Sequence, residues 1–204
     1  NIFKEMGGGS QIFFLCFFAF TGYIVGALLS GIVSIPFTAR GINLSESVAF
    51  LRISQVIIAL CIFLVPSILH SYLFQDKPKN YLKVNSRPSS SFVVLTILLM
   101  LAIQPFIYLA GYFNEQMVLP EFMSPIEEWM KESEESSKRL LSLFLADKSG
   151  LNYLLNIFVI AIVAGITEEF FFRGCLQQSV NKIVLNKNIA IWITAFVFST
   201  IHFQ

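Results

Sequence analysis

Apolar residues occur in long blocks along most of the chain, not at every second position or at a 3.6-residue spacing. At 1.5 Å per helical residue, a block of about 20 residues crosses the ~30 Å hydrocarbon core of a membrane. The pattern therefore predicts an all-α fold, a polytopic transmembrane helical bundle that forms one membrane domain. We place its spans at residues 11–37, 49–74, 91–113, 151–185 and 189–204.

Proline and small residues predict local features of the first and third spans. Pro36 marks the end of the first span, and Pro105 predicts a kink in the third. Gly22, Gly26 and Ser30 recur at four-residue spacing in the first span. Because small residues let helix backbones approach closely in a membrane, this spacing indicates a packing surface for another helix.

Polar residues and cysteines within the apolar blocks give further expectations. Arg52 and His70 stand near the two ends of the second span, where we expect their polar groups to reach the membrane interface. Cys16, Cys61 and Cys175 lie in apolar stretches and form no C-x-x-C pair. We expect small buried side chains, not a disulfide framework or a metal cluster.

The connection at residues 114–150 carries its own helix signal. Ser124, Pro125 and Glu127 combine an N-cap, a proline at the first helical position and a capping-box carboxylate. Apolar residues then alternate with Glu and Lys in an amphipathic pattern. We expect a helix that begins at Ser124 and lies on the membrane surface or caps the bundle.

Composition and charge support a membrane protein and exclude some partners. Hydrophobic residues make up 55% of the chain and charged residues 13%, whereas an ordinary soluble domain has about 25% charged residues. The net charge of +1 does not favour nucleic acid as a partner. Between the second and third spans lie four basic residues, which place that loop and the N-terminus in the cytoplasm: Lys77, Lys79, Lys83 and Arg87. We expect membrane lipid as a partner and the cell membrane as the location.

Two carboxylates and a guanidinium interrupt the fourth span, at Glu168, Glu169 and Arg173. An ionisable group at the centre of a membrane helix costs at least ~2.5 kcal/mol, so such groups face a bundle interior or water. Glu169 and Arg173 stand at i and i+4, the spacing of a helical ion pair. Glu168 lies about 100° round the helix, where it can face a cavity.

His202, near the end of the last span, is the expected partner of these carboxylates. If the fourth helix continues to about Leu185 and the next returns antiparallel to it, Glu168 and His202 differ in depth by about 6 Å. Both side chains can then meet in one buried cavity. Burial and the Arg173 guanidinium have opposite effects on the proton affinity of Glu168, so it can act as a general base towards water. The imidazole can orient that water, stabilise an oxyanion or ligate a metal.

These two motifs, Glu168-Glu169-x-x-x-Arg173 and Phe198-x-x-x-His202, resemble the first two motifs of the CPBP family. That family, also called Abi, comprises CAAX-processing and bacteriocin-processing intramembrane proteases. The resemblance implies an endopeptidase whose site holds Glu168, His202, Glu169 and Arg173. Its substrate would be a membrane-associated or lipidated peptide or protein. Zinc or another divalent metal could be held by Glu168 and His202, or the site could use no metal; both alternatives stay open.

One further family motif, with a histidine on a later helix, has no counterpart in these residues. Residues 189–204 are also shorter than the ~20 residues of a usual span. We therefore expect the chain to be a fragment of a longer protein, which need not be active alone. Two other classes remain: an ion- or proton-coupled transporter, and a catalytically silent scaffold. A second set of broken helices that repeats the arrangement of the first half would favour transport.

Overall fold

The structure is a computed structural model that describes residues 2–82, 84–85, 87–116 and 120–201. Every regular element within these ranges is a helix, which confirms the all-α prediction. Within the described residues, four helices are long and apolar enough to cross a membrane, and a further apolar helix is shorter, at Lys187–Ile201. The four are Gly8–Thr38, Val48–Phe74, Ser90–Asn114 and Gly150–Val184. The chain is therefore a polytopic helical membrane protein.

The described residues divide into two compact units. The larger contains the described residues before 83 and those from 137 onward, and the smaller contains those from 84 to 136. Both carboxylates and the arginine of the fourth span lie in the larger unit, so the larger unit holds what the structure shows of the candidate site.

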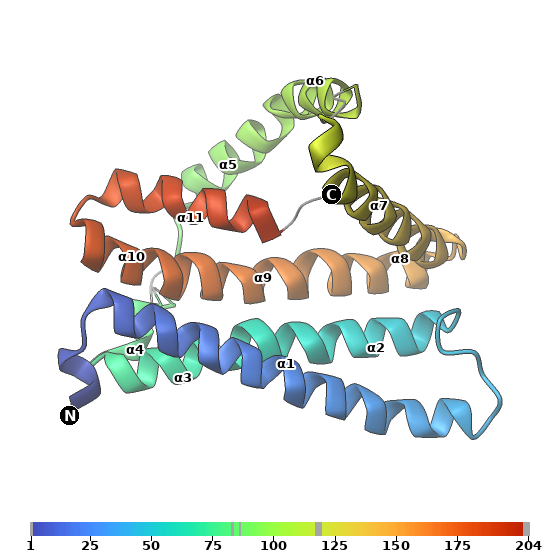
Figure 1. The fold of residues 1–204 in the computed structure, drawn as a ribbon, viewed down its shortest axis with the longest axis horizontal. Helices are drawn as coiled ribbons and strands as arrows, with labels where there is room; N and C mark the ends of the chain where they lie inside the picture. The colour runs from blue at the N-terminus through green and yellow to red at the C-terminus, as the bar shows by residue number, and fades with distance from the viewer. Residues whose placement is uncertain (1, 83, 86, 117–119, 202–204) are drawn as a thin grey trace. The chain divides into compact units, whose positions relative to one another are not determined.

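The larger unit begins with a hairpin of two long helices (Figure 1). A short 3₁₀ turn, η1 (Ile2–Glu5), precedes α1 (Gly8–Thr38). The returning helix consists of α2 (Val48–Ala59), a π-helical segment η2 (Leu60–Leu64) and α3 (Val65–Phe74), and the one-turn helix α4 (Pro78–Tyr81) follows. Ser47 caps α2, because its side chain accepts a hydrogen bond from the Phe50 N–H.

Glycines on α1 allow the two helices of this hairpin to approach closely. A Cβ atom added at Gly22 would overlap the carbonyl oxygen of Cys61, and one at Gly26 would lie 3.2 Å from the Cys61 Cβ. The predicted packing role of these two glycines is confirmed. Cys61 belongs to the π segment η2, which ends just before Pro66. Since Pro66 has no N–H to donate to the preceding turn, the regular hydrogen-bond ladder cannot continue through it.

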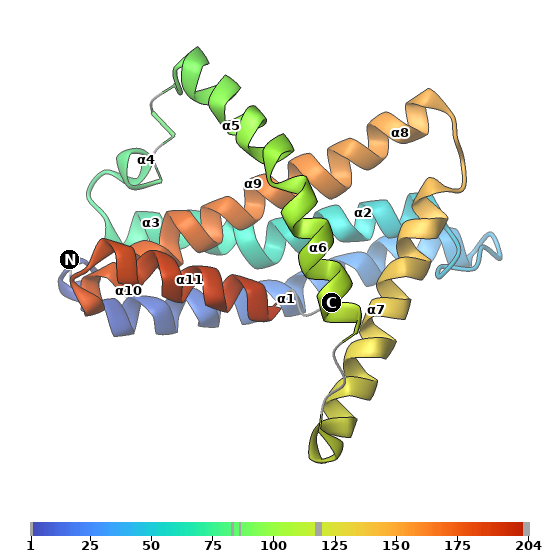
Figure 2. The ribbon, with the colours of Figure 1, turned by 90° about the horizontal axis from the view of Figure 1, so that it is seen from above.

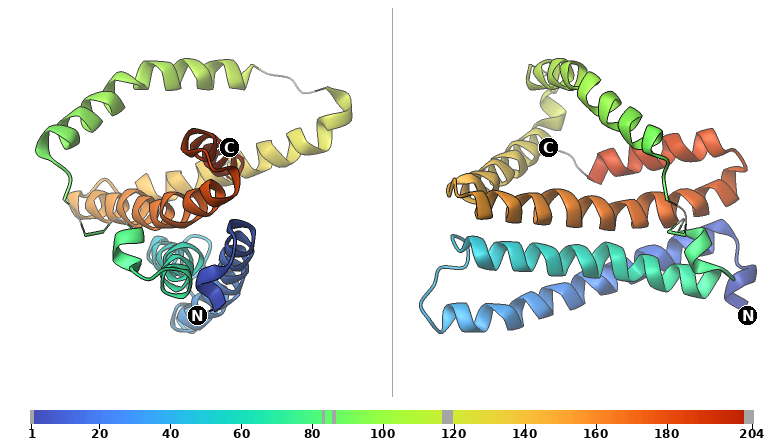
Figure 3. Two further views of the ribbon diagram at one scale, coloured as in Figure 1. Left: turned by 90° about the vertical axis from the view of Figure 1, so that its left-hand side faces the viewer. Right: turned by 180° about the vertical axis from the view of Figure 1, so that it is seen from behind.

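The second half of the larger unit is one continuous helix of 35 residues that alternates between α and π geometry. Its segments are α8 (Gly150–Asn156), η4 (Ile157–Val163, π), α9 (Ala164–Glu169), η5 (Phe170–Leu176, π) and α10 (Gln177–Val184). Leu185 reverses the chain with a left-handed φ of 53°, and α11 (Lys187–Ile201) returns antiparallel along α10 (Figures 1 and 3). The long helix runs parallel to α2–α3.

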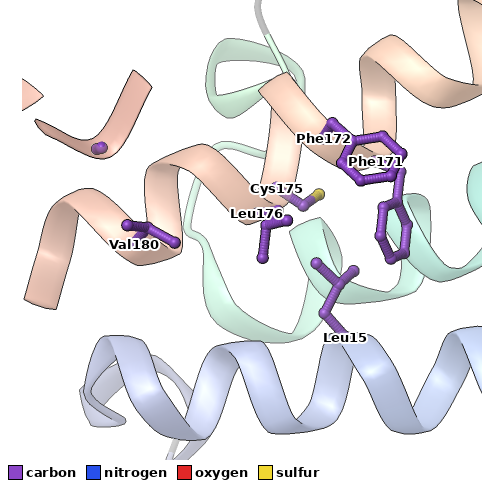
Figure 4. Packing of buried hydrophobic residues seen from close by; sticks show 7 residues of the cluster. Leu15, Phe171, Phe172, Cys175, Leu176 and Val180 are labelled. Atoms are coloured by element: carbon purple, nitrogen blue, oxygen red, sulfur yellow. The ribbon is translucent and has the colours of Figure 1, made fainter. Parts of the chain in front are cut away.

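A small apolar core lies where α1, the long helix and α11 meet (Figure 4). Its members are Leu15, Phe171, Phe172, Cys175, Leu176, Val180 and Ala190. Most other large apolar side chains of the spans are exposed, including Phe13 on α1 at 66% and Leu154 on α8 at 64%. Apolar side chains that face outwards in this number fit hydrocarbon, and not water, as the solvent of the spans.

The smaller unit contains the third span, which is broken in the middle. Helix α5 (Ser90–Ala102) ends one residue before α6 (Gln104–Glu115), and Ile103 forms the turn between them (Figure 2). Pro105 is the second residue of α6. Its ring would clash with the carbonyl of residue 101 in a continuous helix, which explains the break.

The predicted amphipathic helix is α7 (Ser124–Leu145), which follows the 3₁₀ turn η3 (Glu121–Met123) and extends into the larger unit. It begins at Ser124 as expected. Ser124 itself has helical dihedral angles, φ −52° and ψ −37°, so it is the first helical residue and not an extended N-cap. Glu127 accepts a 2.6 Å hydrogen bond from Lys131 along the helix.

Three expectations about polar and thiol side chains were wrong. Arg52 does not reach outwards but bonds to Asn152 and Asn156 of α8. His70 is fully buried, with its ring centroid 4.8 Å from that of Phe74. Of the cysteines, only Cys175 is buried, whereas Cys61 is half-buried and Cys16 is exposed. In each case the helix packing, which hydropathy does not reveal, decides where the side chain points.

The close approach at Gly22 predicts a steep cost for one added methyl group. Gly22→Ala should lower the free energy of unfolding by about 1–3 kcal/mol, because backbone atoms of η2 must move. Gly31→Ala on the same helix is the matched control, since its Cβ would meet no described atom within 4 Å. Thermal unfolding in detergent measures both, and equal stability of the two variants would contradict the packing.

Candidate functional site

The two carboxylates occupy the last turn of α9, between two π-helical segments. A π turn has i→i+5 hydrogen bonds, so it changes which residues share a helix face, and π segments are frequent at functional sites. The six-residue stretch Ala164–Glu169 is thus a regular turn and a half of α-helix inside a helix that is irregular on both sides. Its rotation depends on both irregular segments.

Aromatic packing fixes the buried face of this part of the helix. The ring centroids of Phe171 and Phe172 lie 5.4 and 6.0 Å from that of Phe63 on η2. Phe171 and Phe172 are 8% and 1% exposed, and Figure 4 shows both close to the Cys175 and Leu176 side chains. Thr167 is also buried, and its hydroxyl donates a 3.1 Å hydrogen bond to the Ala164 carbonyl. Glu169 therefore points away from this face, whereas Glu168, four residues before Phe172, lies at its margin.

The opposite face carries the ion pair. Arg173 donates a hydrogen bond to the Glu169 carboxylate across one turn, as the i, i+4 spacing predicts. The side chains remain 62% and 55% exposed respectively. One turn earlier, a Cβ at Gly165 would meet no described atom within 4 Å. Gly165, Glu169 and Arg173 form an open strip, and charged groups on such a strip inside a span need water or protein against them.

Glu168 lies between the buried and the open face. Its side chain is half-buried, in contrast to the exposed Glu169. It stands about 100° round the helix from Glu169, at the margin of the open strip. This position gives its carboxylate a mixed environment, with protein on one side and the polar strip on the other.

The second motif reaches the first through an aromatic contact. Phe198 of α11 packs edge-on against Phe172, with ring centroids 5.0 Å apart. Phe172 follows Glu168 by four residues, about one turn. The predicted meeting of Glu168 with His202 concerns a residue outside the described ranges, so it stays a prediction.

Metal binding also stays a prediction. Among residues 2–82, 84–85, 87–116 and 120–201, no group of three or more His, Cys, Asp or Glu side chains lies close enough to hold a metal ion. Glu168 and His202 would supply two donors, and a protein zinc site needs at least three protein ligands. We therefore derive no chemical step through a metal.

A polar network at the start of the long helix was not anticipated from the sequence. Arg52 of α2 bonds to the side-chain oxygens of Asn152 and Asn156, which are 8% and 6% exposed. A weak signal was present, because two asparagines at i, i+4 in an apolar segment need polar partners. Nothing in the sequence pointed to Arg52, about 100 residues earlier, as that partner.

Comparison with known proteins finds a similarity over the segment that carries both motifs. Residues 150–204 match the model of the family described as type II CAAX prenyl endopeptidase Rce1-like. The match covers the long helix, α11 and both motifs, a little over a quarter of the chain. It confirms the resemblance to the CPBP proteases over this part. No curated protein and no solved structure matches the chain.

The open strip predicts a face-dependent pattern of thiol labelling in membranes. Cysteine at position 169 or 173 should react with a water-soluble maleimide about tenfold faster than cysteine at position 167 or 172, because thiol reactivity follows access. The variants are Glu169→Cys, Arg173→Cys, Thr167→Cys and Phe172→Cys, each compared with the parent, which keeps its three native cysteines. Equally slow labelling at all four positions would mean that the strip meets lipid or packed protein.

Proposed function

We propose that this chain carries the catalytic helix of an intramembrane endopeptidase. The observation that carries the proposal is the placement of Glu168 beside the open, ion-paired strip of a membrane span. The family match over residues 150–204 supports the same reaction class. The substrate we propose is a membrane-associated or lipidated peptide or protein.

Glu168 is the proposed general base. Its carboxylate takes a proton from water while the water oxygen attacks the carbonyl carbon of the scissile peptide bond. The carbon–nitrogen bond then breaks, and the proton passes from Glu168 to the leaving amine. Water supplies the oxygen atom and the transferred proton, and Glu168 carries that proton from the water to the amine. General base catalysis of this kind contributes about 10²–10⁴-fold to the rate.

The ion pair has a supporting role in this proposal. Arg173 bonds to Glu169, which compensates the charge of one of two neighbouring carboxylates. Two adjacent negative charges would otherwise raise the cost of keeping Glu168 ionised at membrane depth. The pair also keeps polar groups on the strip, where water needed for hydrolysis can be held.

His202 is proposed as the second residue of the site, where it orients the water or stabilises the oxyanion. The contact between Phe198 and Phe172 sets the register of the antiparallel hairpin. One turn forward from Phe198 leads to position 202, and one turn back from Phe172 leads to Glu168. This register supports the pairing of the two motifs.

An apolar stripe supports a substrate that approaches from the lipid. Phe158, Ile162 and Ile166 recur at four-residue spacing towards the carboxylates and are 51%, 45% and 51% exposed. A lipid chain or an apolar peptide segment can lie along such a stripe, which adjoins the open strip beside Glu169, and bring a polar peptide bond to that strip. The description of the matched family, a type II CAAX prenyl endopeptidase, fits this class of substrate.

We propose the cell membrane as the location, with the N-terminus in the cytoplasm. The basic residues around α4 carry this orientation, since Lys77, Lys79 and Arg87 lie in the short connection after Phe74. Short loops rich in Lys and Arg remain on the cytoplasmic side of a membrane.

Cleavage of membrane-anchored peptides by the purified full-length protein in detergent tests the proposal. Glu168→Gln should lower the rate of cleavage about 10²–10⁴-fold, because the amide cannot accept the proton. His202→Ala should also abolish most of the activity. Glu128→Gln is the matched control, since it makes the same change on an exposed position of α7 and should leave the rate unchanged.

The outcome that contradicts the proposal is cleavage at equal rates by the parent and both site variants. A folded parent that cuts no member of the peptide panel also contradicts it. Ion movement by that parent in liposomes would then identify the polar strip as part of a transport pathway.

A further inference from the structure

Side-chain hydrogen bonds tie the second span and its following turn to the helix that bears Glu168 at two places, on either side of the aromatic contact of Phe63 with Phe171 and Phe172. At the first, the Arg52 Nε and Nη2 atoms donate hydrogen bonds of 3.1 and 2.6 Å to the Asn156 Oδ1 atom. Nη2 also donates to the Asn152 side-chain oxygen. One guanidinium from α2 thus holds two successive turns of α8.

The same two asparagines fasten the end of α7. The Asn156 and Asn152 amides donate hydrogen bonds of 2.7 and 3.3 Å to the Phe144 carbonyl, and Asn152 also donates 2.7 Å to the Asp147 carbonyl. The Arg52 guanidinium lies 5.7 Å from the centre of the Phe144 ring, which is 2% exposed. Buried amides that bond on both sides hold their geometry firmly, because each lost bond leaves an unpaired polar group. We call this network the Arg52 clamp.

The second tie lies beyond Glu168 on the same helix. The Cys175 thiol donates a 3.5 Å hydrogen bond to the Ser67 carbonyl of α3. Gln178 of α10 donates a 2.8 Å hydrogen bond to the Tyr81 carbonyl of α4. Glu168 and Glu169 therefore stand on a stretch of helix that is held at both ends.

The two ties enclose unequal lengths of chain. Fifteen residues separate Arg52 from Ser67, whereas nineteen separate Asn156 from Cys175 on the neighbouring, parallel helix. Two π segments, η4 and η5, lie almost entirely within the longer stretch, and one, η2, lies within the shorter. A π turn contains more residues than an α turn, so the π segments accommodate part of the difference in residue number between the two stretches. The rotation of α9 between them depends on where each end is held.

We infer that Arg52 is a positioning residue for the proposed active site. By holding Asn152 and Asn156, it fixes the start of the long helix, keeps η4 in its π geometry and so sets the rotation of α9. That rotation decides which of the two side chains, Glu168 or Glu169, lies in the half-buried position and which lies on the open strip. The inference rests on the proposed function only where it predicts effects on cleavage.

The direct test compares thiol labelling at the two carboxylate positions. Glu168→Cys and Glu169→Cys are labelled with a water-soluble maleimide in membranes, each with Arg52 intact and with Arg52→Ala. With Arg52 present, position 169 should react faster than position 168. Loss of the clamp should change the ratio of the two rates about fivefold or more, since labelling follows access. General destabilisation raises both rates together and leaves the ratio unchanged.

Two variants sharpen this test. Arg40→Ala removes an exposed cation from the loop after α1, at the same end of the hairpin, and should not change the ratio. Arg52→Lys keeps the charge but not the two-pronged donor geometry, so it should restore the ratio only in part. An unchanged ratio in a folded Arg52→Ala protein would overturn the inference.

Activity provides a separate readout. In the full-length protein, Arg52→Ala should lower kcat for peptide cleavage about tenfold or more with little change in KM, because a misplacement of ~1 Å can cost up to about 100-fold. A parent protein without any cleavage activity would remove the proposed function, while the labelling ratio would still decide whether Arg52 sets the rotation of α9. An equal fall in activity for Arg52→Ala and Arg40→Ala would speak against a positioning role.

Discussion

Hydrocarbon offers no hydrogen-bond partner, so a polar group in a span is costly unless protein or water supplies one. The backbone meets this requirement by forming only helices as the regular elements of the described ranges. Side chains meet it by pairing between helices, as Arg52 does with Asn152 and Asn156, and Cys175 with Ser67. The Glu169–Arg173 pair compensates its own charges yet remains on an open face. The proposed function rests on this polar pair and on Glu168 beside it.

Irregular helix geometry concentrates around the short segment α9, which ends at Glu169. The π segments η4 and η5 lie on either side of α9, and η2 lies on the span that packs against it. Close backbone contact at Gly22 and the missing N–H of Pro66 accompany η2. The two ties between the spans hold this arrangement at both ends, so the position of the carboxylates depends on contacts that lie 6 to 17 residues away along the helix.

The sequence predicted features that depend on local spacing. Block length gave the four long apolar helices, the i, i+4 rule gave the Glu169–Arg173 pair, and small residues at four-residue spacing gave the contact of Gly22. Features that depend on distant partners were missed. Arg52 and His70 were expected to face the interface, because hydropathy does not reveal which helix lies alongside. The π segments have no comparable sequence signal, and the pairing of Glu168 with His202 stays a prediction.

The central claim is that Glu168 serves hydrolysis and not transport. The most direct measurement places the full-length protein in liposomes and records both cleavage of a membrane-anchored peptide and movement of protons or other ions. Our account predicts a cut peptide with an unchanged ion gradient, and no cut when Glu168 is replaced by Gln. Dissipation of the gradient by the parent, with the peptide intact and the effect lost in Glu168→Gln, would contradict it.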